Sequence, residues 1–174
     1  MRTATIVLLL TLPLAARAAE VESRVLTHYV PQDLLESAVR KEGWTELALA
    51  VKGGLLKGDV VRVWAGGSID RGGDRPGENA NGPAGTGAGG AAFALSAEPG
   101  HGHALLFRSE TGGVKRCPPP GKPLEIKLTR ANEKLWLGFN DRRGGYHDNR
   151  LGRGRRHEHD PLWVRVEVVR VVVD

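Results

Sequence analysis

The chain has 174 residues, with 25 Lys and Arg against 20 Asp and Glu, and a formal net charge of +5. This length favours one domain with a substantial hydrophobic core. Its single cysteine, Cys117, excludes an intrachain disulfide, so packing, with or without a bound ion, must stabilise the fold. The moderate positive charge suits an anionic partner without requiring one.

Residues 1–18 have the pattern of a secretory signal peptide. Arg2 gives a positive start, residues 6–12 are apolar, and Ala16 and Ala18 mark a predicted cleavage site. The apolar run is too short to span a bilayer, and no later stretch is predicted to do so. We therefore expect a secreted or periplasmic protein without a membrane span. Removal of Arg2 and Arg17 lowers the formal charge from +5 to +3.

The remaining sequence alternates short β-like runs with glycine-rich loops. The predicted strands are Val25–Val30, Glu46–Val51, Asp59–Trp64, Ala91–Leu95, His103–Arg108, Leu124–Leu128, Leu135–Phe139 and Leu162–Val173. Within one of them Val61 and Val63 alternate with Arg62, which indicates one buried and one wet face. About eight short strands separated by turn signals predict an all-β sandwich in preference to an α/β fold.

Two segments depart from simple alternation. Residues 32–40 carry apolar side chains at helical spacing and predict either a short helix or a plain connection. In the last strand the alternation breaks at Val168 and Val169, where a β-bulge would return Arg170 to the solvent face.

A long loop, residues 66–90, is dominated by glycine, alanine, asparagine and proline. It contains Asp70, Asp74, Glu78, Asn79 and Asn81. Loops of this length inside compact domains are usually either functional or disordered, and composition alone leaves both interpretations open.

The loop 140–149 is the most informative segment. It places Asp141, Asp148 and Asn149 around the turn formers Gly144 and Gly145. Calcium takes six to eight oxygen ligands, so this loop alone supplies too few, and we expect the segment that begins at Arg71 to contribute as well. Without the ion, the two carboxylates would repel and at least one pKa would rise. The alternative is a hairpin connection rich in turn-forming residues.

Other chemistries are weaker. Asp141 and Asp148 could imitate a glycosidase pair, but the loop context favours ion binding, and we do not expect an enzyme. His101 and His103 have the spacing of side chains on one face of a strand and raise the alternative of zinc, although solvated loop histidines are the simpler interpretation. An arginine cluster borders the loop: Arg142, Arg143, Arg150, Arg153, Arg155 and Arg156. It suits anionic sugars or a solvated rim, and we expect no nucleic-acid partner.

The order of these features resembles a known family. A strand beginning at Gly58-Asp59-Val60 leads into Ser68-Ile69-Asp70-Arg71-Gly72, and a later strand ends in Gly138-Phe139-Asn140-Asp141 before the loop Gly144-Gly145-Tyr146-His147-Asp148-Asn149. From about Trp44 to Val173 the chain is similar to the PA-IL-like calcium-dependent galactose-binding bacterial lectins.

The resemblance implies a jelly-roll-like β-sandwich of two antiparallel sheets in residues 44–174. Outside the resemblance, the sequence predicts the signal peptide (1–18) and an N-terminal extension packing on the domain (19–43). It implies that calcium is held by the side chains of Asp141, Asp148 and Asn149 and the carbonyls of Arg71 and Gly145. Asp141 and Asn149 would also bind the sugar hydroxyls, and Tyr146 would lie beside the sugar ring.

Three departures bear on sugar choice. Position 148 is Asp where the family has Asn, and Gly145 replaces a threonine. The family's additional sugar-contacting histidine and glutamine have no clear counterpart, although Glu78, Asn79 and Asn81 lie in the corresponding region.

The sequence therefore predicts an exported, non-catalytic, calcium-dependent carbohydrate-binding protein of galactose-type lectin character, and the resemblance allows for a homo-oligomer. The alternative is a structural or interaction β-sandwich whose sugar site is vestigial. A basic adhesin for anionic polymers is a third interpretation.

Overall fold

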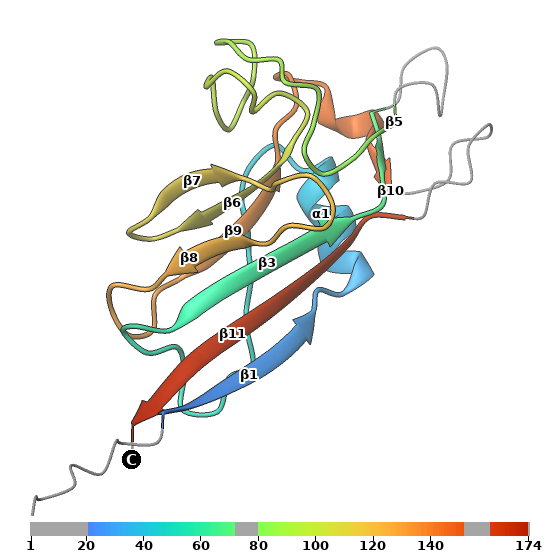
Figure 1. Cartoon of the computed structure of the whole chain (residues 1–174). Coiled ribbons are helices and arrows are strands. Elements are labelled where there is room, and N and C mark those ends of the chain that lie inside the picture. Colours follow the sequence, from blue (N-terminus) through green and yellow to red (C-terminus); the bar gives the residue numbers. More distant parts are fainter. Residues whose placement is uncertain (1–20, 72–79, 152–160, 174) are drawn as a thin grey trace, which may run out of the picture.

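The computed structural model describes residues 21–71, 80–151 and 161–173, and it is an all-β sandwich with one short α-helix (Figure 1). The elements in chain order are β1 (Val21–Tyr29), α1 (Gln32–Arg40), β2 (Thr45–Glu46), β3 (Val60–Gly66), β4 (Ile69–Asp70), β5 (Ala80–Asn81), β6 (Leu105–Ser109), β7 (Gly113–Arg116), β8 (Leu124–Lys127), β9 (Leu135–Phe139), the 3₁₀ turn η1 (Tyr146–Asp148), β10 (Arg150–Leu151) and β11 (Trp163–Val173). The fold-class prediction is thus confirmed.

Two four-stranded antiparallel sheets form the layers. The strand order is β1-β11-β3-β8 in one sheet and β2-β9-β6-β7 in the other. A small third sheet, β10-β4-β5, lies with α1 at the end of the sandwich opposite the C-terminus (Figure 1). This end carries the loops that the sequence singles out.

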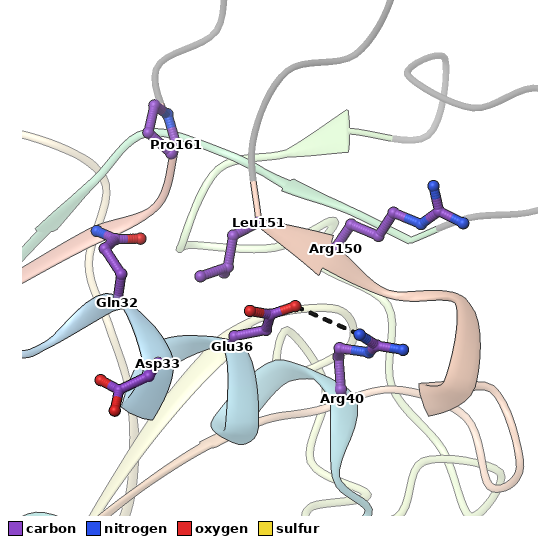
Figure 2. A pocket seen from close by; sticks show the side chains of 7 residues that line it. All are labelled: Gln32, Asp33, Glu36, Arg40, Arg150, Leu151 and Pro161. Carbon is purple, nitrogen blue, oxygen red and sulfur yellow. Dashed lines mark hydrogen bonds and ion pairs between the residues drawn. The ribbon is translucent and has the colours of Figure 1, made fainter.

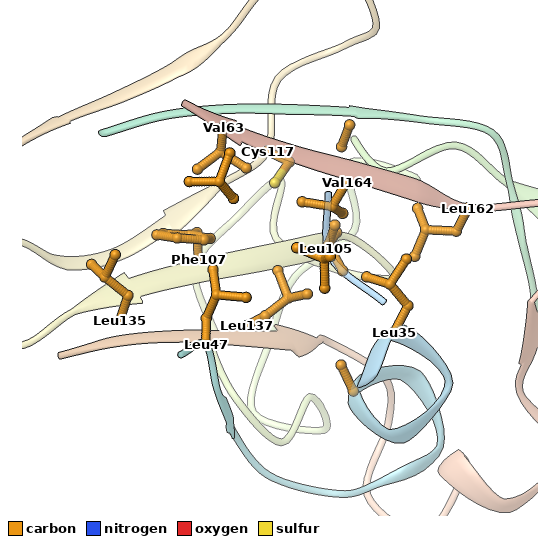
Figure 3. Packing of buried hydrophobic residues seen from close by; sticks show 14 of the residues in the cluster. Leu35, Leu47, Val63, Leu105, Phe107, Cys117, Leu135, Leu137, Leu162 and Val164 are labelled. Atoms are coloured by element: carbon orange, nitrogen blue, oxygen red, sulfur yellow. The ribbon is translucent and has the colours of Figure 1, made fainter. Parts of the chain in front are cut away.

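The core lies between the two large sheets and follows the predicted alternation. Val61 and Val63 of β3 are fully buried, as is Val166 of β11, while Arg62 between the two β3 valines is half-buried on the outer face. They belong to one cluster with Phe107, Leu135 and other side chains of the second sheet. Figure 3 shows Val63 and Val164 of the first sheet above Phe107 and Leu137 of the second. Burial of such apolar area is the main favourable contribution to folding.

The segment before Trp44 is part of this architecture. β1 pairs with β11 along its whole length, from Val21↔Val173 to Tyr29↔Arg165. The helix α1 forms as one of the two predicted alternatives and buries Leu35, Ala38 and Val39 against the core. Within the described residues, no helix is both long enough and apolar enough to cross a membrane.

Several sequence predictions differ from the structure. Residues 91–95 form turns and an isolated bridge from Phe93 to Arg142, because Ala94 N donates to Asp141 O and Ala92 O accepts from Arg143 N. The predicted strand at 46–51 shortens to β2. Cys117, which follows β7, is fully buried in the core.

The predicted bulge in the last strand is absent. The register of β11 runs unbroken through Val168↔Val61 and Val169↔Val60. Arg170 instead stays on the inner side, where Nε lies 2.9 Å from Asp59 Oδ1 and Nη2 lies 2.7 Å from Asp59 Oδ2. A bidentate ion pair with a buried carboxylate therefore replaces the expected solvent contact.

Candidate functional site

The 140–149 loop is organised around Tyr146, the first residue of η1. Its hydroxyl accepts a hydrogen bond from Asp141 N at 3.1 Å and lies 3.4 Å from Asp141 O, and the residue is only 4 % exposed. Burial raises the pKa of Tyr146 to about 12. The resemblance implies that Tyr146 lies beside the sugar ring, whereas in the structure its ring and hydroxyl are buried inside the loop.

Asn140 fixes a second loop against the first. Its Oδ1 accepts from Leu95 N and Ser96 N, and its Nδ2 donates to Ser96 O at 2.8 Å and His101 O at 2.9 Å. All its polar capacity is used, and the residue is fully buried. The backbone adds Ala94 N to Asp141 O at 3.0 Å. Residues 94–101 are thereby held beside Asp141, a role for Asn140 that sequence reasoning missed.

Asp141 lies at the centre of the site and is 5 % exposed. Its Oδ1 accepts from Arg142 N at 2.7 Å and lies 3.4 Å from His103 Nε2. Burial alone would raise the pKa of Asp141, but hydrogen bonds from His103, the Arg142 backbone and Asn149 outweigh it and lower that pKa. The expected repulsion-driven rise in pKa therefore does not occur at Asp141, because protein donors stabilise its charge.

His103 was not expected at the site. It lies just before β6 in a left-handed turn, with φ of +53°, and its ring packs edge-on against Phe93 with the ring centroids 5.0 Å apart. Arg71 Nη1 lies 3.2 Å from His103 Nδ1 and 3.3 Å from Nε2. The imidazole thus stands between Arg71 and Asp141. We expected a solvated histidine, whereas the side chain is buried and only 8 % exposed.

The two predicted ligand regions converge. β4 pairs with β10 in the register Asp70↔Arg150 and Ile69↔Leu151. Arg71 directly follows β4 and Asn149 directly precedes β10, so one further residue of the same register would set them opposite each other. The separate contacts of His103 with Arg71 and Asp141 connect the same regions.

Asn149 has an unsatisfied acceptor. The residue is fully buried, and its Nδ2 donates to Val39 O of α1 at 2.9 Å. It also donates to the Asp141 carboxylate. These acceptors fix the orientation of the amide, which leaves Oδ1 buried without a hydrogen-bond partner in the described part of the chain. A buried acceptor in this state is costly unless a cation or a donor completes it.

Gly145 and Asp148 occupy the two ends of the 3₁₀ turn. Gly144 adopts φ of +79°, and Gly145 N then donates to Arg142 O at 2.9 Å. A Cβ added to Gly145 would lie 3.4 Å from Asp141 Oδ1, so this glycine passes close to the carboxylate. Asp148 ends η1 and is half-buried.

The remaining predicted sugar contacts are only partly described. Asn81 pairs with Ile69 in β5. The described residues do not include Glu78, Asn79, Arg153, Arg155 or Arg156.

The residues present fit a calcium ion in composition, although the donor set is rich in amide and carbonyl oxygen. Among residues 21–71, 80–151 and 161–173, no cluster of three or more His, Cys, Asp or Glu side chains is arranged to hold a metal. The predicted set contains only two carboxylates, so it would not form such a cluster. The orphaned Asn149 Oδ1 beside Asp141 is the feature that a hard cation would complete.

A separate hollow of about 510 Å³ lies between α1 and β10. Figure 2 shows Glu36 and Arg40 of α1 and Arg150 and Leu151 of β10 around it, with Pro161 at its rim. Glu36 Oε1 pairs with Arg40 Nη1 at 3.3 Å. The walls of this hollow carry both acidic and basic side chains, and none of the predicted calcium ligands lines it.

No protein-family model matches the chain, and the search of curated proteins returns no match.

Proposed function

We propose that the chain is an exported calcium-dependent carbohydrate-binding protein of galactose-type lectin character. The observation that supports this most is the buried, unpartnered Oδ1 of Asn149 beside the charged Asp141. Arg71 directly follows β4 and Asn149 directly precedes β10, and these two strands are paired. These residues belong to the ligand set that the sequence resemblance implies.

The chemistry requires no covalent step. Calcium takes six to eight oxygen ligands. The protein would supply some of them from the side chains of Asp141, Asp148 and Asn149 and from the carbonyls of Arg71 and Gly145. Two neighbouring hydroxyls of a sugar would fill the open positions in place of water. The exchange keeps the oxygen count unchanged, so the spacing of the hydroxyls would decide which sugar binds.

The state of Asp141 favours binding over hydrolysis. A glycosidase acid needs a raised pKa so that it can donate a proton near neutral pH. Hydrogen bonds to Asp141 lower its pKa instead. This carboxylate is therefore suited to bind a cation.

A second candidate is a structural or interaction sandwich whose sugar site is vestigial. It is favoured by the donors that already satisfy Asp141, namely His103, the Arg142 backbone and Asn149. In this case the protein would order the loop without an ion, and calcium, if bound, would add only stability.

Isothermal titration separates these candidates. The purified protein is titrated with calcium, and then with galactose in the presence of calcium or of excess chelator. We expect calcium binding, galactose binding only when calcium is present, and at least a tenfold loss of calcium affinity in Asp141→Asn. Glu125→Gln is the matched control, because it removes an exposed carboxylate on β8.

Three results are informative. Calcium binding without any response to a panel of neutral sugars favours the vestigial site. Calcium affinity that is unchanged in Asp141→Asn contradicts the ligand assignment. Binding of galactose in chelator would contradict a role for calcium in sugar recognition.

A further inference from the structure

The strand β1 is an unpaired edge of unusual length. It lies at the end of the sheet order β1-β11-β3-β8 and spans nine residues, all paired with β11. Within the described residues no strand covers its other side. An exposed edge of this kind can pair with another chain, and proteins usually protect it.

The opposite edge of the same sheet shows such protection. β8 is four residues long, and its Glu125 and Lys127 are exposed charged residues. β1 instead carries exposed apolar side chains, with Val25 50 %, Leu26 38 % and Tyr29 70 % exposed. Val25 and Leu26 are consecutive and lie on opposite faces, so the middle of this strand exposes apolar surface on both faces of the sheet, although its first half also contains Glu22 and Arg24.

The hydrogen-bond pattern identifies which backbone groups are free for a partner. Val30 N donates to Val164 O, and the register continues through Tyr29↔Arg165. In an antiparallel ladder hydrogen-bonded pairs alternate, so the even-numbered residues of β1 bond to β11. The backbone groups of Val25, Thr27 and Tyr29 therefore point to the open edge.

We propose that a second copy of this chain pairs with β1 edge to edge and antiparallel, about a two-fold axis at Val25. In this register Val25 faces its own counterpart, Thr27 faces Ser23 of the partner subunit, and Tyr29 faces Val21 of the partner subunit. The hydrogen-bonded pairs of this register are all odd-numbered, so the outward donors and acceptors of one strand meet those of the other over the full length of β1.

Self-complementarity is the reason to choose a second copy over an unrelated strand. An isologous contact needs one surface that matches itself, and full overlap centred on Val25 leaves no outward group of β1 unmatched. The two four-stranded sheets would join into one continuous sheet. This inference does not depend on the proposed calcium site.

Sedimentation velocity over a range of concentrations tests the proposal. The sample is the protein after any signal-peptide cleavage in the expressing cell. We expect a monomer–dimer equilibrium that weakens at least tenfold in Val25→Lys, because two like charges would face each other at the axis. Leu56→Lys is the matched control, since Leu56 is also apolar and 42 % exposed but lies outside β1. It should leave the equilibrium unchanged.

Amide hydrogen exchange gives a test that needs no variant. Protection at Val25, Thr27 and Tyr29 should rise with protein concentration, while Leu26 and His28 stay protected throughout. A chain that is monomeric at all concentrations overturns the proposal, as does a dimer unaffected by Val25→Lys. Protection of the odd-numbered amides at every concentration also overturns it, because another part of the chain would then cover the edge.

Discussion

His103 Nε2 lies 3.4 Å from Asp141 Oδ1, and the two buried side chains join loops that are distant in the sequence. The contact depends on the backbone at His103, which has φ of +53°. Histidine, asparagine and aspartate adopt this conformation more readily than most other residues. His103 therefore has two roles: it adopts the left-handed backbone conformation of this turn, and its side chain contacts Asp141.

Substitution of His103 should separate these two roles. Both His103→Ala and His103→Asn lose the ring contact with Phe93, but Asn tolerates the left-handed conformation better. We expect His103→Ala to be less stable than His103→Asn by about 1 kcal/mol in urea denaturation. Equal stabilities would show that the backbone at this position relaxes in the variants.

The Arg170–Asp59 pair should contribute strongly to stability. Asp59 is 2 % exposed, and Arg170→Ala would leave its carboxylate buried without its cationic partner. We expect a loss of about 3 to 5 kcal/mol in free energy of unfolding. Arg62→Ala, which breaks the exposed pair with Glu125, should cost less than about 1 kcal/mol. Similar losses in the two variants would contradict this interpretation of the inner position of Arg170.

Acid should destabilise the fold through three buried carboxyl groups. Burial alone would raise the pKa of Asp59, Glu133 and Asp141, but hydrogen bonds outweigh it, and each pKa is lowered. Groups of this kind stabilise the fold above their ordinary pKa, which is 3.8 for Asp and 4.5 for Glu, and the contribution is lost as pH falls through the lowered folded values.

Urea midpoints measured from pH 7 to pH 3 test this expectation. Glu133 accepts hydrogen bonds from Thr111 N at 3.0 Å and Thr129 N at 3.2 Å, so Glu133→Gln should be less stable than the natural chain at pH 7. The difference should narrow towards pH 3, because only the natural chain loses this charge. A constant difference would show that the charge of Glu133 is not responsible.

Cys117 should be chemically silent in the folded protein. It is fully buried, and burial raises the pKa of its thiol to about 12, so little thiolate forms at neutral pH. We expect labelling by a thiol reagent to be slow in buffer and rapid in denaturant. Rapid labelling of the native chain would mean that the core near β7 opens frequently.

Sequence periodicity identifies the sandwich because long strands need a buried face. Val61, Val63 and Val166 follow that rule. Arg170 departs from it, because its partner Asp59 is distant in sequence and no local pattern reveals the pair. The short strands β4, β5 and β10 have only two residues each, which is too few for any alternation to be visible.

The candidate site could be predicted from the sequence only in part. The 140–149 loop has a compact motif, and a resemblance to a family supplied Arg71. The inward direction of His103 depends on a single positive φ, and the use of Tyr146 as an internal support depends on the closure of its own loop. Neither has a sequence signal apart from the glycines around His103.

The bond from Asn149 Nδ2 to Val39 O has a practical meaning for truncated versions of the protein. A fragment that starts at Trp44 would retain the whole acidic loop but would lose the carbonyl that orients its amide. It would also expose the flank of β11 that β1 normally covers. The smallest fragment worth expressing therefore includes β1 and α1, because α1 orients the Asn149 amide of the ligand loop and β1 covers the edge of β11.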